Sequence, residues 1–143
     1  RVVRYLKRWK DVRFSSRGNA APPGIALTVA AHRHFMAEFF RDGRPNDVEA
    51  LIGVVSGIID SFAVRGLAWF LLGGPSHKVR IELPVEPFSN LCERMTPRHM
   101  QRFYDELVWL LETLQAVRKG RSEAKACERL QKVFGADFPL PAD

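Results

Sequence analysis

Hydrophobic residues along most of this chain recur at intervals of three and four positions, which is the period of one face of an α-helix. In residues 1–13, for example, the apolar positions fall on one side of a helix and charged residues occupy the other. The residues that flank each periodic segment indicate where it begins and ends. Together these signals predict five helices, over residues 1–13, 24–40, 47–64, 97–119 and 123–134.

The predicted helix ends carry residues with a physical reason to be there. Pro22 and Pro23 precede the second helix, where the missing N–H of a proline removes no intrahelical hydrogen bond. Side chains that can cap an N-terminus precede the last three helices, and a glycine follows each of the last two. These residues are Asn46, Thr96, Ser122, Gly120 and Gly135.

Residues 79–83 follow a different pattern, because apolar and charged side chains alternate there. This alternation is typical of a short strand with one buried face, and Gly73-Gly74-Pro75 before it is typical of a turn. A lone strand leaves its backbone groups unpaired, so we expect its partner to lie outside this sequence. The predicted fold class is mostly α: a bundle of about five helices with one short strand, forming a single domain over residues 1–143.

The positive charge of the chain is concentrated at one end. The formal net charge is +6, and residues 1–17 account for all of it, with seven Lys and Arg residues against one acid, Asp11. The remainder of the chain is balanced, with 15 basic and 15 acidic residues. Such a cluster is explained either by a solvated helix face or by a site for phosphate or another polyanion.

Several other kinds of site find little support. His32 and His34 are two positions apart, so on a helix they point about 200° away from each other and cannot share a metal ion. Residues 73–76 lack the Lys-Ser/Thr that completes a phosphate-binding loop. No run of about 18 apolar residues is present, which predicts no membrane-spanning helix. Cys92 and Cys127 form no CxxC pair and are predicted to be free, buried thiols in a reducing cytoplasm.

One arrangement could bind phosphate. Lys7 lies two positions before Trp9 on the first helix, and Pro22, Pro23 and Gly24 open the second helix. The free N–H groups and positive dipole end of a helix N-terminus favour an anion, and a lysine on the adjacent helix would add a charge for the same anion. If Trp9 anchors the first helix in the core, Lys7 lies about 200° around the helix and faces away from it.

The segments Val-Arg-Tyr-Leu-Lys-Arg-Trp (residues 3–9) and Pro-Pro-Gly-Ile-Ala-Leu-Thr (residues 22–28) are followed by residues 79–91, 94–96 and 133–139. In this order the segments resemble the C-terminal helical lobe of the oligoadenylate synthetase and cyclic GMP–AMP synthase superfamily. The resemblance is to its bacterial members above all, the CD-NTases of CBASS antiphage operons. It covers nearly the whole chain.

The resemblance implies an enzyme of which this chain is one part. In the family, a Gly-Ser motif and three carboxylates that hold two Mg²⁺ ions catalyse nucleotidyl transfer. None of these residues can be matched here, so the N-terminal nucleotidyltransferase core that binds Mg²⁺ is expected upstream, and no catalytic residue or metal ligand is assigned to this chain. The implied substrates are ATP- or GTP-type triphosphates, and the implied product is a cyclic-oligonucleotide second messenger made in the cytoplasm. Operon-encoded regulatory proteins are implied as further partners.

The resemblance also implies roles for two residues. Lys7 matches the lysine two positions before the tryptophan, which in relatives contacts the donor triphosphate. The residue after the two prolines is commonly polar in the family but is Gly24 here, so only its backbone could contact the phosphates. The lobe would close the nucleotide cleft from one side. Two alternatives stay open: a stand-alone nucleotide or nucleic-acid binding module that uses the basic first helix, and a structural interaction domain.

Two further expectations follow. The first residue is Arg rather than Met and already lies within a helical pattern, so we expect the native N-terminus upstream. Without the catalytic core, we expect apolar surface to be exposed on the first and third helices.

Overall fold

The computed structural model describes residues 1–14, 21–64, 77–78, 81–82, 84 and 89–136. Most of these residues belong to five helices, which confirms the predicted fold class. The helices are α1 (Val2–Arg13), α2 (Gly24–His34), α3 (Asp47–Asp60), α5 (Pro97–Lys119) and α6 (Glu123–Phe134). In this part of the chain no helix combines the length and apolar character needed to cross a bilayer.

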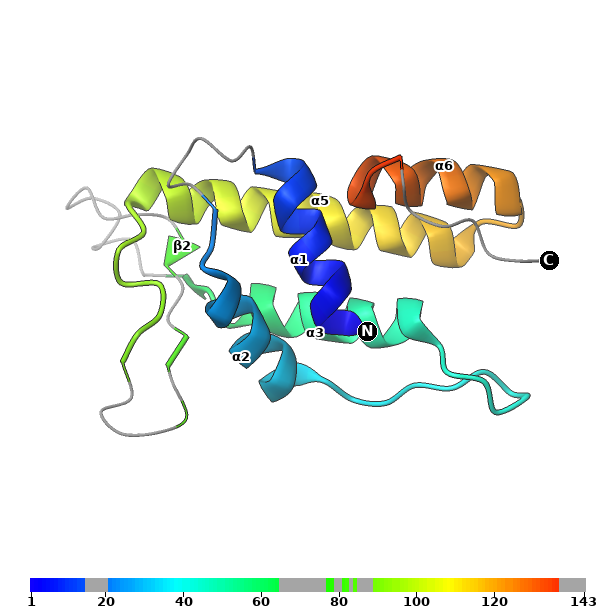
Figure 1. Ribbon diagram of the computed structural model, residues 1–143, viewed down its shortest axis with the longest axis horizontal. Coiled ribbons are helices and arrows are strands. Elements are labelled where there is room, and N and C mark those ends of the chain that lie inside the picture. The colour runs from blue at the N-terminus through cyan, green and yellow to red at the C-terminus, as the bar shows by residue number, and fades with distance from the viewer. Residues whose placement is uncertain (15–20, 65–76, 79–80, 83, 85–88, 137–143) are drawn as a thin grey trace.

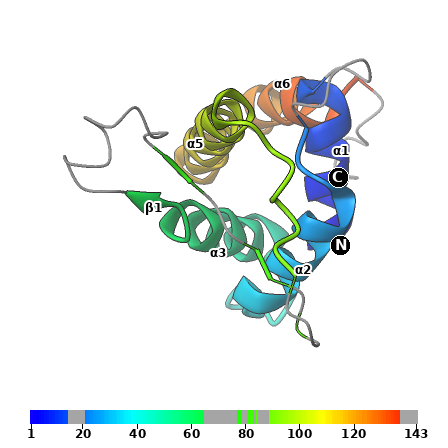
Figure 2. The same cartoon turned by 90° about the vertical axis from the view of Figure 1, so that its left-hand side faces the viewer.

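The long helix α5 organises the packing. It contacts α3 on one side and α6 on the other, and both run in the opposite direction to α5 (Figure 1). Helix α1 crosses this layer and contacts α2, α3 and α6. Viewed from the end, α1 and α2 lie on one flank of the α3–α5 pair (Figure 2). Residues at the two ends of the sequence therefore share one core.

The core is built around aromatic side chains from distant segments. Trp9 is completely buried, and its ring lies 5.6 Å from that of Phe14 and 6.3 Å from that of Phe103. Phe62, just after α3, packs edge-on against Phe103 with 5.5 Å between ring centroids. Burial of such side chains contributes most of the free energy that holds the helices together.

The predicted helix caps are confirmed. The Asn46 side chain accepts a hydrogen bond from the Glu49 N–H (3.1 Å), and the Thr96 hydroxyl accepts one from the His99 N–H (3.2 Å). The Ser122 hydroxyl does the same for the Lys125 N–H (3.3 Å). Gly120 and Gly135 are the C-caps of the last two helices, and Gly135 has φ +93°, which side chains disfavour.

Helix α2 ends at His34, so the predicted extension to residue 40 is wrong. Phe35 adopts extended backbone angles, and residues beyond it turn back at Gly43 (φ 86°) to form an antiparallel bridge between Phe39 and Pro45. The apolar residues of this segment recur at helical spacing, but they do not form a helix and do not contribute to the core. Their side chains are at least half exposed: Phe35, Met36, Phe39 and Phe40.

The expected location of exposed apolar surface is also wrong. Among the described residues, α3 exposes no large apolar side chain and α1 exposes only Val12. The α3 side chains that point away from solvent are covered by α2 and α5. Apart from Val12 on α1 and Ile25 on α2, the large apolar side chains that are exposed among the described residues belong to the segment after α2.

The third helix ends at Asp60 rather than at residue 64. Ser61 closes it, since its N–H donates to the carbonyls of Gly57 and Ile58 and its hydroxyl donates to that of Ile58 (2.6 Å). The chain then forms β1 (Ala63–Val64), which pairs antiparallel with β2 (His77–Lys78). Neither strand was predicted, and this pairing does not include residues 79–83.

The predicted strand over residues 79–83 lies mostly outside the described residues, as do Gly73, Gly74 and Pro75. Of its described members, Ile81 is buried and Glu82 forms an isolated antiparallel bridge with Asn90. The Asn90 side chain accepts hydrogen bonds from the N–H groups of Ile81 (3.2 Å) and Cys92 (3.0 Å). Both residues are thereby held against the core.

Candidate anion-binding site

The orientation predicted for Lys7 is confirmed. Trp9 is completely buried between α1 and the rest of the bundle, and Lys7, two positions earlier, is exposed. Leu6 is also completely buried, so the inner side of α1 is fixed by apolar contacts. Because α1 cannot rotate without exposing these residues, Lys7 is held on its outer side.

Most of the arginines in residues 1–13 make contacts within the fold. Arg1 forms an ion pair with Asp47 (3.4 Å), and the Arg8 side chain donates to the Phe134 carbonyl at the end of α6 (2.7 Å). Arg13 pairs with Glu106 (2.7 Å) and its guanidinium lies 4.0 Å from the centre of the Trp109 ring. Part of the positive charge in residues 1–17 is therefore explained by contacts within the fold. Arg17 lies outside the described residues.

Two lysines of α1 instead meet the first residue of α2. A methyl group placed on Gly24 would lie 3.8 Å from the Lys10 Nζ and 4.0 Å from the Lys7 Cε. Within the described residues neither lysine forms an ion pair. The Lys10 ammonium group and the end of the Lys7 side chain thus lie beside the start of α2, although they come from a separate helix.

The start of α2 carries unsatisfied hydrogen-bond donors of its own. Its N-cap is Pro23, which has no capping side chain, and its first turn contains no acidic residue. The N–H groups of Ala26 and Leu27 donate to the Pro23 carbonyl (3.0 and 3.3 Å), which leaves those of Gly24 and Ile25 without an intrahelical acceptor. The helix dipole adds partial positive charge at the same point. An anion placed here would meet backbone donors and two ammonium groups together.

Lys10 was missed by the sequence reasoning, which assigned only Lys7 and Gly24. A signal was present, because Lys10 lies three positions after Lys7 and residues at this spacing share one side of a helix. The spacing does not show that this side faces the start of another helix. That relationship depends on how α1 and α2 pack, which Trp9 and Leu27, both buried, help to determine.

The described residues contain no comparable group of side chains suited to metal binding or thiol chemistry. No three His, Cys, Asp or Glu side chains among them are grouped so that they could hold a metal ion. Cys92 is buried, and burial raises the pKa of its thiol to about 11. Cys127 is only partly buried, which corrects the expectation that both thiols are buried.

Comparison with known proteins identifies the fold. No protein-family model matches the sequence, and no curated protein matches it either. The structure is similar to that of the DncV cyclic AMP-GMP synthase of Vibrio cholerae in complex with nonhydrolyzable GTP, with a TM-score of 0.67 and 19% sequence identity. The match covers 99% of this chain and 35% of the synthase chain, so this chain spans about a third of that enzyme's length. The resemblance to a CD-NTase is thus confirmed at the level of the fold.

Proposed function

We propose that this chain is the helical lobe of a CD-NTase-type cyclic-oligonucleotide synthase, and that it binds the triphosphate of the donor nucleotide. The observation that carries the proposal is the convergence of Lys7 and Lys10 on Gly24, at a helix start with no acidic residue in its first turn. The similarity to a synthase determined with a GTP analogue supports this choice of ligand.

The chemistry of the site suits a triphosphate better than an anion with one negative charge. The Lys7 and Lys10 ammonium groups are compact charges on flexible stems, so each can follow a different phosphate group. The N–H groups of Gly24 and Ile25 would hold one phosphate oxygen in a fixed position. Together these groups would orient the donor nucleotide and offset the charge that develops on its phosphates during transfer.

The remaining chemistry would come from a nucleotidyltransferase core that precedes this lobe. Mg²⁺ ions bound there stabilise the attacking hydroxyl and the leaving pyrophosphate in enzymes that use two metals. The described residues of this chain do not fit that role, since they contain no cluster of carboxylates able to hold a metal. The chain alone should therefore convert no nucleoside triphosphate. The proposal places the complete enzyme in the cytoplasm, in antiphage signalling with operon-encoded regulatory proteins.

Calorimetric titration of the chain with a nonhydrolysable GTP analogue, and separately with inorganic tripolyphosphate, tests the proposal. Lys7→Ala should weaken binding of both ligands by about 1.5–3 kcal/mol, the usual range for a hydrogen bond to a charged group. Lys119→Ala removes an exposed lysine at the far end of α5 and should leave both affinities unchanged. Equal affinity in the wild type and in Lys7→Ala would contradict the triphosphate role.

The alternative of a nucleic-acid binding module makes a different prediction in the same assay. A basic surface that follows a nucleic-acid backbone binds oligonucleotides with an affinity that falls steeply as salt is added. A single-stranded oligonucleotide that binds more tightly than the GTP analogue, and competes with it, would favour this alternative.

A further inference from the structure

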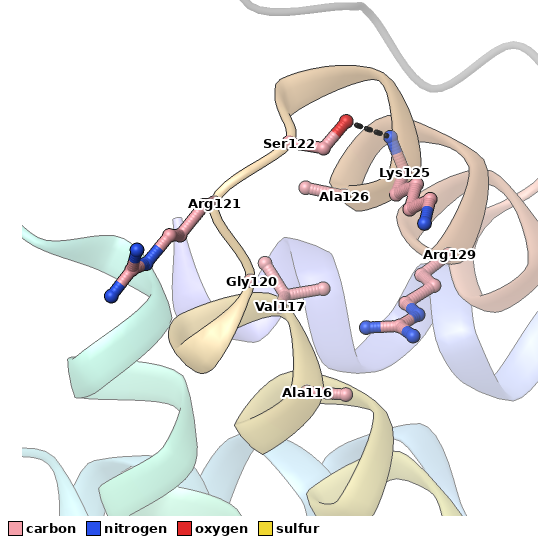
Figure 3. A pocket seen from close by; sticks show the side chains of 8 residues that line it. All are labelled: Ala116, Val117, Gly120, Arg121, Ser122, Lys125, Ala126 and Arg129. Atoms are coloured by element: carbon pink, nitrogen blue, oxygen red, sulfur yellow. Dashed lines mark hydrogen bonds between the residues drawn. The ribbon is translucent and has the colours of Figure 1, made fainter.

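A groove runs between the second half of α5 and the length of α6, away from the Lys7 site. It consists of two hollows of about 340 and 290 Å³. The two hollows are neighbours, because Ala116 and Arg129 line both of them, and together they are here called the α5–α6 groove. Figure 3 shows the first hollow, at the turn between the two helices.

One wall of the α5–α6 groove is basic. Three of its cations occur on α6 at intervals of four and three residues and therefore share one side of that helix: Lys125, Arg129 and Lys132. Arg121, in the turn before α6, also lines the first hollow. In Figure 3 the Lys125 and Arg129 side chains lie on the α6 side of the hollow, whereas Arg121 extends the other way. The opposite wall is mainly apolar and includes Ala116, Val117 and Trp109.

The described part of the fold pairs none of these cations with an acid. Within the described residues none of the four forms an ion pair, although Arg118 on the neighbouring turn of α5 reaches Glu49 (3.2 Å). Among the described residues that line the two hollows, Glu112 is the only acid. Like charges four residues apart, such as Lys125 and Arg129, repel each other and destabilise a helix. An anionic partner would remove this cost.

We propose that the α5–α6 groove binds an extended acidic segment of a partner protein, in which acidic and apolar residues alternate. Cations four residues apart on a helix are separated by about 6 Å along its axis. Alternate residues of an extended segment are separated by about 6.6 Å, and residues between them point to the opposite side. Carboxylates of such a segment would meet Lys125 and Arg129 in turn, while its apolar residues contact Val117 and Ala116.

Two features of the groove favour a peptide over a nucleic acid. The first hollow includes the C-terminal turn of α5, whose last carbonyl groups have no intrahelical donor. A peptide supplies N–H donors to such carbonyls, whereas a phosphodiester supplies none and meets the negative end of the helix dipole. Trp109, the aromatic residue of the groove, already has the Arg13 guanidinium over its ring at 4.0 Å, so that face is closed to the base stacking that single strands require.

Fluorescence anisotropy with a labelled eight-residue peptide that alternates Glu and Val tests the proposal, with unlabelled dT8 as the competing nucleic acid. The variant Lys125→Glu/Arg129→Glu should bind the peptide about tenfold more weakly than the wild type or worse, because two ion pairs become repulsive contacts. Arg94→Glu/Arg98→Glu makes the same change in net charge at exposed residues before and at the start of α5, and should keep most of the affinity. Circular dichroism establishes that both variants are folded.

The proposal is supported if the wild type and Arg94→Glu/Arg98→Glu bind the peptide and only Lys125→Glu/Arg129→Glu loses the affinity. It is overturned if both double variants lose affinity equally, which would show attraction to net charge alone. It is also overturned if the wild type does not bind the peptide, or if dT8 binds more tightly and depends on Lys125 and Arg129. Binding to the Lys7 site is measured separately with tripolyphosphate, so failure of either proposal leaves the other standing.

Discussion

The imidazole ring of His34 lies directly against Gly57. A methyl group placed on Gly57 would stand 2.5 Å from both Cγ and Nδ1 of that ring and 2.9 Å from its Cβ, closer than carbon atoms approach without repulsion. The last turn of α2 therefore packs on α3 at a position that tolerates only hydrogen.

This contact predicts that Gly57→Ala destabilises the protein by about 1–3 kcal/mol, the usual cost of overpacking, despite the better helix propensity of alanine. Gly53 is the matched control, because it lies one turn earlier on α3 and a methyl group there would meet nothing within 4 Å. Gly53→Ala should stabilise by about 0.5–1 kcal/mol. Urea unfolding followed by circular dichroism measures both changes. In the His34→Gly background, which lacks both the ring and its Cβ, Gly57→Ala should cost less stability than in the wild type. An equal cost in the two backgrounds would refute His34 as the obstacle.

The surroundings of His34 also predict a pH dependence. Burial lowers the pKa of its imidazole below the ordinary value of 6.5, the nearby charge of Arg33 lowers it further, and Asp60 partly opposes both. The unfolded chain therefore binds more protons than the folded chain just below pH 6.5, so the free energy of unfolding should fall as the pH drops from about 7 to 5.

Chemical denaturation at a series of pH values measures this effect. His34→Gln cannot titrate and should show a flatter profile across this range than the wild type. His32→Gln, at an exposed position on the same helix turn, should keep the wild-type profile. If the two variants have identical profiles, His34 is not the group responsible.

Lys7 and Lys10 should act on the same ligand. Each single alanine variant should weaken binding of tripolyphosphate, and the double variant should differ from the sum of the two by about 0.5 kcal/mol or more, as contacts to a shared partner do. Calorimetry on the four proteins of the cycle measures the coupling. Strict additivity, or an effect of Lys7 alone, would place Lys10 outside the site.

Gly24 allows a gain-of-function test. The neighbouring lysine atoms lie 3.8 and 4.0 Å from a methyl group at this position, which is ordinary contact distance, so a small side chain fits. Gly24→Ser should tighten tripolyphosphate binding, because its hydroxyl can donate to an anion held between Lys7, Lys10 and the helix start. Gly24→Ala fills the same space without the hydroxyl and should bind like the wild type. Equal affinity in the serine and alanine variants would show that no phosphate oxygen comes near residue 24.

The two cysteines should react at different rates. Because burial raises the pKa of the Cys92 thiol to about 11, very little of it is thiolate at pH 8, and its sulfur is also shielded from reagents. Cys127 on α6 is partly exposed. A thiol-reactive chromophore should therefore modify Cys127 first in the folded protein and both cysteines after denaturation. Cys127→Ser should abolish the fast phase, and rapid modification that persists in this variant would contradict the burial of Cys92.

Local chemistry made the helix starts predictable from the sequence. Asn46, Thr96 and Ser122 cap their helices through hydrogen bonds to residues three positions later, so each signal lies within one turn of the chain. Lys7 could be placed on the outer side of its helix because Trp9, two positions away, had to be inside. Neither inference needs knowledge of another part of the molecule.

Packing between distant segments decided the rest. Phe39 and Phe40 continue the apolar period of α2, but the core was already filled by residues from α1, α3 and α5, so these side chains remain exposed and the helix ends at His34. Lys10 meets Gly24 only because α1 and α2 pack together across the intervening loop. The sequence alone determined where the helices begin and which side of α1 carries charge. Tertiary structure decided which of those charges neutralise the fold's own acids and which stay available at the start of α2, because ion pairs form between residues that only folding brings together.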